Sequence, residues 1–346
     1  MDYSARLIRL EKRLDDLSCH ALLIENPVDL LYLTGLELSS GKLLIGKNST
    51  TLFVDGRYIE HCQKNSPCSA VLYKESEFIE RISLLGTLGF DSVYTSYQNF
   101  LNMKKWGSVR LIPLESPVSP LREIKDADEI TLLRQAAQLD VQGFLFAQSF
   151  LKEGISEFEV ALELELFWKK RGGRKVGFDP IIAFGPNTAM PHYRAGNAKL
   201  KYGMPVLIDI GVTFHHYQSD MTRVVFFGPA DPKLQEIYTI VDEAKQKAMA
   251  LCRPGAKVGD LDAAARDHIA AKGYGDNFSH SLGHGVGLEV HESPTLRNRP
   301  PYSEKVLSPG FVITIEPGIY LPGLGGVRLE DTLVITPTGY EILTVN

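Results

Sequence analysis

The chain has 346 residues, more than one ordinary hydrophobic core requires, so its length alone predicts two domains. Its 44% hydrophobic and 23% charged residues are typical of a globular protein and exclude wholesale disorder. The formal net charge is −5 and no Lys/Arg-rich stretch stands out, so we expect no nucleic-acid partner.

The first 17 residues mix charges with apolar residues at helical spacing. This pattern predicts an amphipathic helix and not a secretory signal. No run approaches the ~20 apolar residues of a membrane span, so we expect no membrane partner. The four cysteines are scattered and form no tight metal-like pair: Cys19, Cys62, Cys68 and Cys252. Such cysteines are typical of free thiols in a reducing compartment, and we expect a cytoplasmic protein.

The first part of the chain alternates strand and helix signals as far as about residue 112. Strands are predicted over 21–26, 49–56, 89–96 and 108–113, and a capped helix over 26–35. Residues 111–129 then gather three prolines followed by charged residues, which is usual at a domain junction. We place the boundary near residues 120–125 and expect domains over 1–122 and 123–346.

The second part begins with long helices and ends in strands. Asp126 and Glu129 are a plausible capping pair for a helix over 130–151. Further helices are predicted over 156–172, 231–252 and 261–272, and strands over 178–184, 283–292, 310–320 and 325–336.

Two carboxylates interrupt apolar strand patterns in PVLIDIGVTFHHYQSDMTRVVFF, residues 205–227. Asp209 stands among Val, Leu and Ile residues, where Asp is depleted, and Asp220 follows eleven residues later. If a hairpin turn centres on Phe214 and His215, the two aspartates lie directly opposite each other. Like charges in that arrangement repel, and burying them unpaired costs several kcal/mol. A cation between them would remove the conflict.

The same pattern recurs downstream. Glu316 is the only charge in a strand that ends at a Pro-Gly pair, and Glu330 interrupts another apolar alternation. The stretch SLGHGVGLEVHE adds His284 and His291. Four carboxylates and one imidazole exceed the needs of one divalent ion but suit two ions that share carboxylates. Oxygen-rich ligation with one imidazole favours Mn²⁺, with Co²⁺, Zn²⁺ or Fe²⁺ as alternatives.

Each residue also has a reading without a metal. Glu330 could be a salt-bridged strand residue beside Arg328 and Asp331, Asp220 a turn residue, and His284 a solvated loop histidine. The metal hypothesis therefore depends on the whole set of residues.

Order, spacing and flanking residues together resemble the pita-bread metallopeptidases. The matching positions are Asp209, Asp220, His284 in GHGVG, Glu316 in TIEPG and Glu330 in RLEDT. Their flanks are similar to the aminopeptidase P and prolidase branch, as are GPNTAMPHY, NPVDLLYLTG and LREIKDADEI, so the resemblance covers nearly the whole chain.

The resemblance implies an α/β (α+β) fold with two domains. The carboxyl-terminal catalytic domain would be a pita-bread domain with a strongly curved antiparallel sheet, and the smaller amino-terminal domain would be creatinase-like. It also implies a homodimer and a dinuclear metal-dependent exopeptidase.

The implied reaction is attack by a metal-bridged hydroxide on the Xaa-Pro bond of small peptides whose second residue is proline. By this resemblance Glu316 is both a ligand and the proton shuttle. His291 and His192 would stabilise the oxyanion, and Arg328 would orient ligands.

Two positions depart from the family pattern. Phe184 stands where a small residue is usual, and we expect it to reshape the pocket wall. Thr295 stands where many prolidase-like members carry an arginine. Arg297 or Arg299 would then have to bind the substrate carboxylate instead.

We expect aminopeptidase P-like action on longer peptides as the main function, with prolidase action on Xaa-Pro dipeptides as the alternative. A non-catalytic pita-bread binding module is a further possibility, but such modules lose ligands and this chain has all five. A dinuclear hydrolase of other amides or esters is the remaining alternative.

Overall fold

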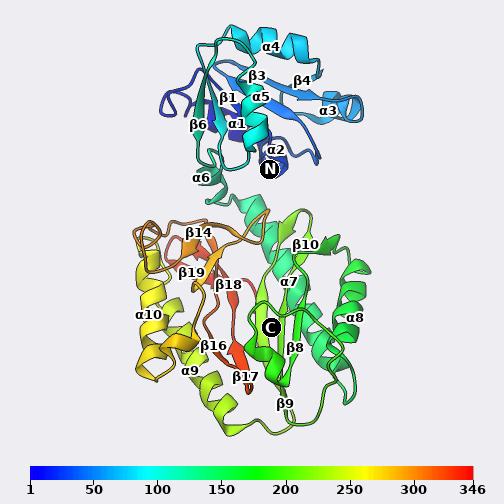
Figure 1. The fold of residues 1–346 in the computed structure, drawn as a ribbon, viewed down its shortest axis with the longest axis vertical. Helices are drawn as coiled ribbons and strands as arrows, with labels where there is room; N and C mark the ends of the chain where they lie inside the picture. The colour runs from blue at the N-terminus through cyan, green and yellow to red at the C-terminus, as the bar shows by residue number, and fades with distance from the viewer. Residues whose placement is uncertain (346) are drawn as a thin grey trace. The chain divides into compact units, whose positions relative to one another are not determined.

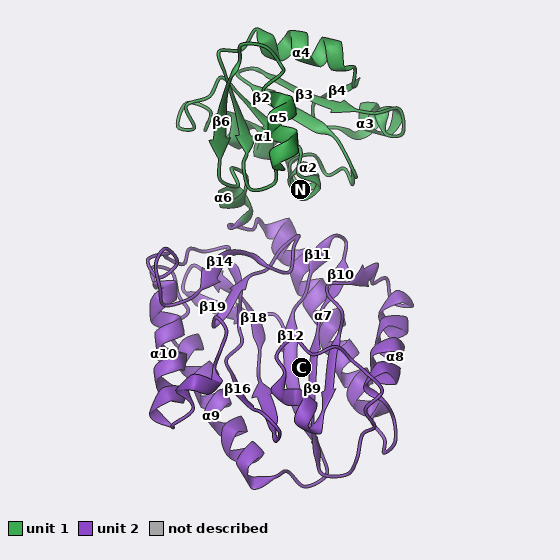
Figure 2. Cartoon of the chain, viewed as in Figure 1, with its two compact units in different colours: residues 1–122 green, residues 123–346 purple. Residues whose placement is uncertain are grey.

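The computed structural model describes residues 1–345 and divides into two compact units, Met1–Arg122 and Glu123–Asn346 (Figure 2). None of the helices in the described residues is long and apolar enough to cross a membrane. The four cysteines are free, and three of them are buried.

The first unit is a six-stranded mixed sheet with helices packed around it (Figure 1). The strand order is β4-β3-β2-β1-β5-β6, and only β2 runs antiparallel to its neighbours. Its strands are β1 (Ala21–Ile24), β2 (Lys42–Gly46), β3 (Ser49–Val54), β4 (Ser69–Leu72), β5 (Thr87–Asp91) and β6 (Arg110–Leu114). Its helices are α1 (Tyr3–Glu11), α2 (Pro27–Thr34), α3 (Ile59–Asn65), α4 (Glu75–Ser83), α5 (Tyr97–Met103) and α6 (Ser119–Arg122).

The second unit contains four long helices and several antiparallel sheets. The helices are α7 (Ala127–Phe150), α8 (Glu157–Lys169), α9 (Pro232–Met249) and α10 (Val258–Ala271). One three-stranded sheet has the order β12-β9-β8, from β8 (Ile181–Phe184), β9 (Met204–Ile210) and β12 (Met221–Phe227), and another joins β7 (Lys175–Val176), β10 (Val212–Phe214) and β11 (Tyr217–Gln218). The five-stranded sheet has the order β14-β13-β15-β18-β19, from β13 (Gly283–Gly285), β14 (Glu292–Leu296), β15 (Val312–Ile315), β18 (Asp331–Thr336) and β19 (Gly339–Ile342). A two-stranded sheet pairs β16 (Gly318–Leu321) with β17 (Gly325–Arg328).

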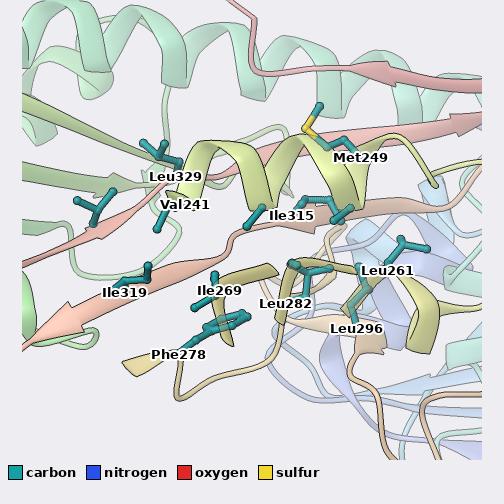
Figure 3. Close-up of a cluster of buried hydrophobic side chains, with 14 of the residues drawn as sticks. Val241, Met249, Leu261, Ile269, Phe278, Leu282, Leu296, Ile315, Ile319 and Leu329 are labelled. Carbon is teal, nitrogen blue, oxygen red and sulfur yellow. The ribbon is translucent and has the colours of Figure 1, made fainter. Parts of the chain in front are cut away.

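Two helix pairs cover these sheets on separate hydrophobic cores (Figure 1). The α7–α8 pair encloses one core with β8, β9 and β12. The α9–α10 pair encloses the other with β14, β15 and β17, where Val241, Ile269 and Ile315 are among the buried side chains (Figure 3). The carboxylates of interest come from strands that border both cores, so the two layers position the site together.

Local sequence signals account for the helix starts. Asp126 and Glu129 form the expected capping box of α7, and Ser156 and Glu159 form another at α8. In the first unit, α2 ends at Gly35, whose φ of 73° lies in the left-handed region that suits glycine. The Gly35 end of α2 and the start of α8 after Ser156 agree with the predictions, whereas α7 and α10 each begin three residues earlier than predicted.

The predicted strand over residues 283–292 is wrong. The chain forms β13 only as far as Gly285, leaves the sheet, and returns as β14 at Glu292. The register of the pair shifts between His284 and Gly285, where a Cβ on Gly285 would meet the backbone of Ser293 at 2.3 Å. The close approach of the two backbones requires glycine there.

Candidate metal centre and active site

Asp209 and Asp220 lie close to the junction of two paired strands, and both are buried (7% and 5% exposed). Asp209 is the penultimate residue of β9, and Asp220 immediately precedes β12. The cross-strand partner of Asp209 is Thr222. The predicted direct pairing of the two aspartates is therefore wrong by two residues.

The turn explains this shift. His215 and His216 both have positive φ, 46° and 74°, and form the two-residue turn between β10 and β11. The predicted turn centred one residue earlier, and moving a hairpin turn by one residue moves the pairing by two. Because side chains alternate with a period of two, this shift leaves each side chain on its face of the strand.

The predicted donors come together from separate strands. His284 is the central residue of β13, and its Nε2 lies 3.6 Å from Asp220 Oδ2 and 3.3 Å from Glu316 Oε1. Glu316 directly follows β15, and Glu330 lies between β17 and β18. One ligand atom each of Asp220, His284 and Glu330 falls within a 4.8 Å cluster, which could hold a metal ion. Three of the four carboxylates thus lie just outside strands: Asp220 before β12, Glu316 after β15 as the Pro-Gly stop suggested, and Glu330 between β17 and β18.

The buried negative charge of this cluster is incompletely paired. Asp209 Oδ1 and Glu330 Oε1 are buried and have no hydrogen-bond partner among the described residues. Burial raises the pKa of Asp220 well above its usual value, and the charge of Glu330 raises it further. Burial, together with the charge of Glu316, likewise raises the pKa of Glu330. Orphaned carboxylate oxygens beside an imidazole are a donor set that fits divalent cations.

Arg328 connects two of these carboxylates. Its guanidinium donates to Asp209 Oδ2 through Nη2, to the Tyr320 hydroxyl through Nη1 (2.8 Å) and to Thr222 Oγ1 through Nε (3.2 Å). Thr222 in turn donates to Glu330 Oε2 at 2.6 Å. The predicted orienting role of Arg328 stays a proposal, and these hydrogen bonds support it. Arg328 holds the Asp209 carboxylate directly and the Glu330 carboxylate through Thr222.

Sequence reasoning missed Thr222, His280 and Tyr320. His280 Nε2 is 2.9 Å from the Tyr320 hydroxyl, and its Nδ1 is 4.0 Å from Glu316 Oε2. The available signal was closeness in sequence to the predicted donors: Thr222 is two residues from Asp220, and His280 is four residues before His284. The contacts themselves join residues far apart in sequence, so spacing alone could not assign them.

Two further histidines, His291 and His192, belong to the surroundings of the cluster. The ring centroids of His284 and His291 are 4.4 Å apart. Burial lowers the pKa of His291, with further lowering from the charges of His284 and His192. His192 is exposed, but its electrostatic effect on His291 places it in the same region. His291 therefore lies beside His284, and His192 lies within electrostatic range of His291.

Phe184 does not lie in a pocket wall. It pairs with Val206 in the β8–β9 ladder and is buried in the core beneath α7 and α8 with Ile208. On the same strand, Asp209 is an odd number of positions from Val206 and from Ile208, so its side chain points to the other face of the sheet. The expectation that Phe184 reshapes the pocket wall is wrong, because strand alternation directs its ring into the core.

Comparison with known proteins gives two domain matches. Residues 131–337 match metallopeptidase family M24, and residues 6–124 match the creatinase/prolidase N-terminal domain. An Xaa-Pro dipeptidase of Pyrococcus furiosus is 39% identical over 342 residues, covering 98% of this chain and 97% of the relative.

Solved structures agree with these matches. The prolidase of Pyrococcus horikoshii has a TM-score of 0.94 at 37% identity, over 99% of this chain and 98% of that one. The X-Pro aminopeptidase of Thermotoga maritima has a TM-score of 0.87 at 33% identity, over 96% and 98%. The predicted α/β fold, with a creatinase-like first domain and a pita-bread second domain, is confirmed. The chain therefore belongs to metallopeptidase family M24, in its aminopeptidase P and prolidase branch, and is a metallo-exopeptidase.

Proposed function

We propose that this chain is an Xaa-Pro dipeptidase that hydrolyses the bond before proline in dipeptides. The observation that carries the proposal is the 39% identity to an Xaa-Pro dipeptidase over nearly the full length of both chains, together with a complete set of donors at the site. This reverses the order of the two activities expected from sequence, in which aminopeptidase P action came first. It also disfavours the binding module, because no predicted ligand is missing.

We propose that Asp209, Asp220, His284, Glu316 and Glu330 hold two divalent cations, most simply Mn²⁺. Four carboxylates and two divalent cations balance in charge, and the orphaned oxygens of Asp209 and Glu330 would then gain partners. When bound, such ions polarise a substrate carbonyl and lower the pKa of a coordinated water.

Within this proposal Glu316 moves the proton. Its Oε1 lies 3.3 Å from His284 Nε2, and the hydrogen bond and charge of His284 lower the Glu316 pKa despite its burial. A carboxylate kept ionised can accept a proton from the attacking water and pass it to the proline nitrogen. That nitrogen is a tertiary amide without an N–H, so it must be protonated as it leaves.

His291 and His192 are proposed to donate hydrogen bonds to the oxygen that becomes negative in the transition state. The lowered pKa of His291 keeps its imidazole neutral at neutral pH, and a neutral imidazole still has one N–H to donate. Arg328 is proposed to hold Asp209 in a fixed orientation through its guanidinium.

A second activity has one specific observation in its favour. Thr295 is the cross-strand partner of His284, and it stands where the resemblance leads us to expect an arginine that would pair with a dipeptide carboxylate. Threonine cannot supply that charge, so cleavage of longer Xaa-Pro peptides remains the alternative. The homodimer and the cytoplasmic location stay predictions.

The test is to strip the protein with chelator, reload it with Mn²⁺, and compare hydrolysis of Ala-Pro with that of Ala-Pro-Ala. Faster turnover of the dipeptide supports the proposal. Cleavage of the tripeptide alone would support the aminopeptidase, and no cleavage of either by protein with two bound ions would refute both substrate assignments.

A further inference from the structure

Glu157 is a fully buried carboxylate at the first residue of α8, and the proposed reaction does not use it. Helix capping does not account for it either. Ser156 caps α8, with Glu159 N–H donating to Ser156 Oγ at 3.2 Å and Ser156 N–H donating to Glu159 Oε2 at 2.8 Å. The carboxylate of Glu157 is therefore available for another role.

Both oxygens of Glu157 accept hydrogen bonds from one stretch of chain, which begins at Phe184 and ends at Gly196. Oε1 accepts from Phe184 N–H at 2.8 Å and from Asn187 Nδ2 at 2.9 Å. Oε2 accepts from the Tyr193 hydroxyl at 2.7 Å and from Gly196 N–H at 3.1 Å. One side chain thus fastens both ends of a loop.

The bonds that hold this loop are of a strong kind. All four donors are neutral and the acceptor is a carboxylate, and hydrogen bonds to an ionised acceptor are roughly twice as strong as neutral ones. Tyr193 also accepts from Asn187 Nδ2 at 2.9 Å. Burial and the neighbouring Glu157 raise the pKa of Tyr193 to about 12, so its hydroxyl keeps its proton over the working pH range.

His192 lies inside this loop, directly before Tyr193. Its imidazole is exposed and makes no hydrogen bond within the part of the chain that the structure describes, so the loop backbone decides where it lies. We propose that Glu157 is a positioning residue that fixes the Phe184–Gly196 loop and so places His192 beside the reacting carbonyl. This inference rests on the proposed function, in which His192 stabilises the oxyanion.

A double-mutant cycle tests the proposal on the Mn²⁺-loaded full-length enzyme. Glu157→Gln keeps the size of the side chain but removes its charge and half of its acceptor capacity. Glu159→Gln is the matched control, because glutamine also completes a capping box. His192→Ala and the double variant Glu157→Gln/His192→Ala complete the set, with kcat and KM measured on Ala-Pro.

We expect Glu157→Gln to lower kcat on the order of tenfold with little change in KM, because misplacing a group that acts in the transition state lowers kcat. In the His192→Ala background the same substitution should change kcat by less than about twofold, because the group that it positions is absent. Glu159→Gln should resemble the wild type, and Mn²⁺ content should be unchanged throughout. An equal loss from Glu157→Gln in both backgrounds, or no loss in either, would overturn the proposal.

Tyr193→Phe supplies the milder variant if Glu157→Gln does not fold. It removes one donor to Glu157 and should show a smaller kcat loss with the same dependence on His192. Amide hydrogen exchange separates this inference from the proposed function, since it needs no activity. In Glu157→Gln, or in Tyr193→Phe if that variant is used instead, amides of the Phe184–Gly196 loop should exchange faster than in the wild type, and those elsewhere should not. This result is expected even if Ala-Pro is not a substrate, and unchanged exchange in the loop would contradict the positioning role.

Discussion

Thr295 and His284 are directly paired across the β13–β14 ladder. Cross-strand partners have Cβ atoms roughly 4.5–5.5 Å apart and share a face of the sheet, so the side chain at position 295 reaches the cluster that holds the imidazole. A residue at this position can therefore affect which peptide termini the site accepts.

Thr295→Arg should shift the enzyme toward dipeptides. A guanidinium at this position can pair with a free carboxylate on proline, which Ala-Pro has and Ala-Pro-Ala lacks there. We expect the ratio of kcat/KM for Ala-Pro to that for Ala-Pro-Ala to rise on the order of tenfold. Thr295→Gln is the uncharged control. A ratio that does not move with the arginine would mean that the carboxylate is held elsewhere, with Arg297 and Arg299 to be substituted next.

Asp220→Asn should leave a folded protein that binds fewer than two ions. Asp220 approaches His284 at 3.6 Å within the clustered donors, and a neutral amide would not supply the negative charge that a carboxylate ligand brings to a divalent cation. Activity on Ala-Pro should fall by more than the roughly 100-fold that loss of an outer-shell partner can cost. Metal content by elemental analysis and turnover are the two readouts, with the exposed Asp267→Asn as the control. Full turnover of the variant would contradict the dinuclear proposal.

In the metal-free protein, Asp220→Asn should increase the stability of the fold. Folding raises the pKa of Asp220, so its ionised form opposes folding at neutral pH and an amide does not. In chelator, Asp220→Asn should therefore have the higher free energy of unfolding at pH 7.

The sign of the pH dependence follows from linkage. A carboxyl whose pKa is raised by folding costs nothing when both states are protonated, and the cost grows as the pH rises from its ordinary value toward its folded value. The advantage of the variant should shrink as the pH falls toward ~4. Urea unfolding in chelator at a series of pH values measures the difference in free energy of unfolding between the variant and the wild type. A difference that grows as the pH falls would refute the argument.

Arg328→Met should destabilise the metal-free protein more than the metal-loaded one. Arg328 is the buried cation that pairs with Asp209, and breaking a buried pair typically costs about 3–5 kcal/mol. Bound cations would compensate part of that charge. We expect the loss in melting temperature to be smaller with saturating Mn²⁺ than in chelator, as measured by differential scanning calorimetry. Equal losses in both conditions would show that the arginine stabilises by packing alone. Tyr320→Phe, which removes the other partner of Nη1, is the control for lost hydrogen bonding.

Sequence predicted the elements whose signals are local. The capping box of α7 and the Gly35 end of α2 follow from a few adjacent residues, and both are present. The candidate donors could be singled out because charges that interrupt apolar patterns recur in four places along the chain. Asp209 in β9 is the clearest case.

Other features depended on geometry that no short stretch encodes. The hairpin register depended on which two residues adopt positive φ, and these are His215 and His216. The position of Phe184 depended on which face of β8 meets a helix layer. The Tyr320–Arg328–Thr222 connection joins side chains from three separate strands and becomes visible only in three dimensions.

The order of the donors along the chain has a consequence for biosynthesis. Asp209 precedes Glu330 by 121 residues, and the intervening chain includes α9, α10 and the strands that carry the remaining donors. A ribosome releases the amino-terminal donors long before the last one, so an unfinished chain lacks the carboxylates needed to complete the cluster. If Glu330 is a required ligand, as proposed, peptidase activity would begin only when synthesis is almost complete, and truncated chains that end before Glu330 would be inactive.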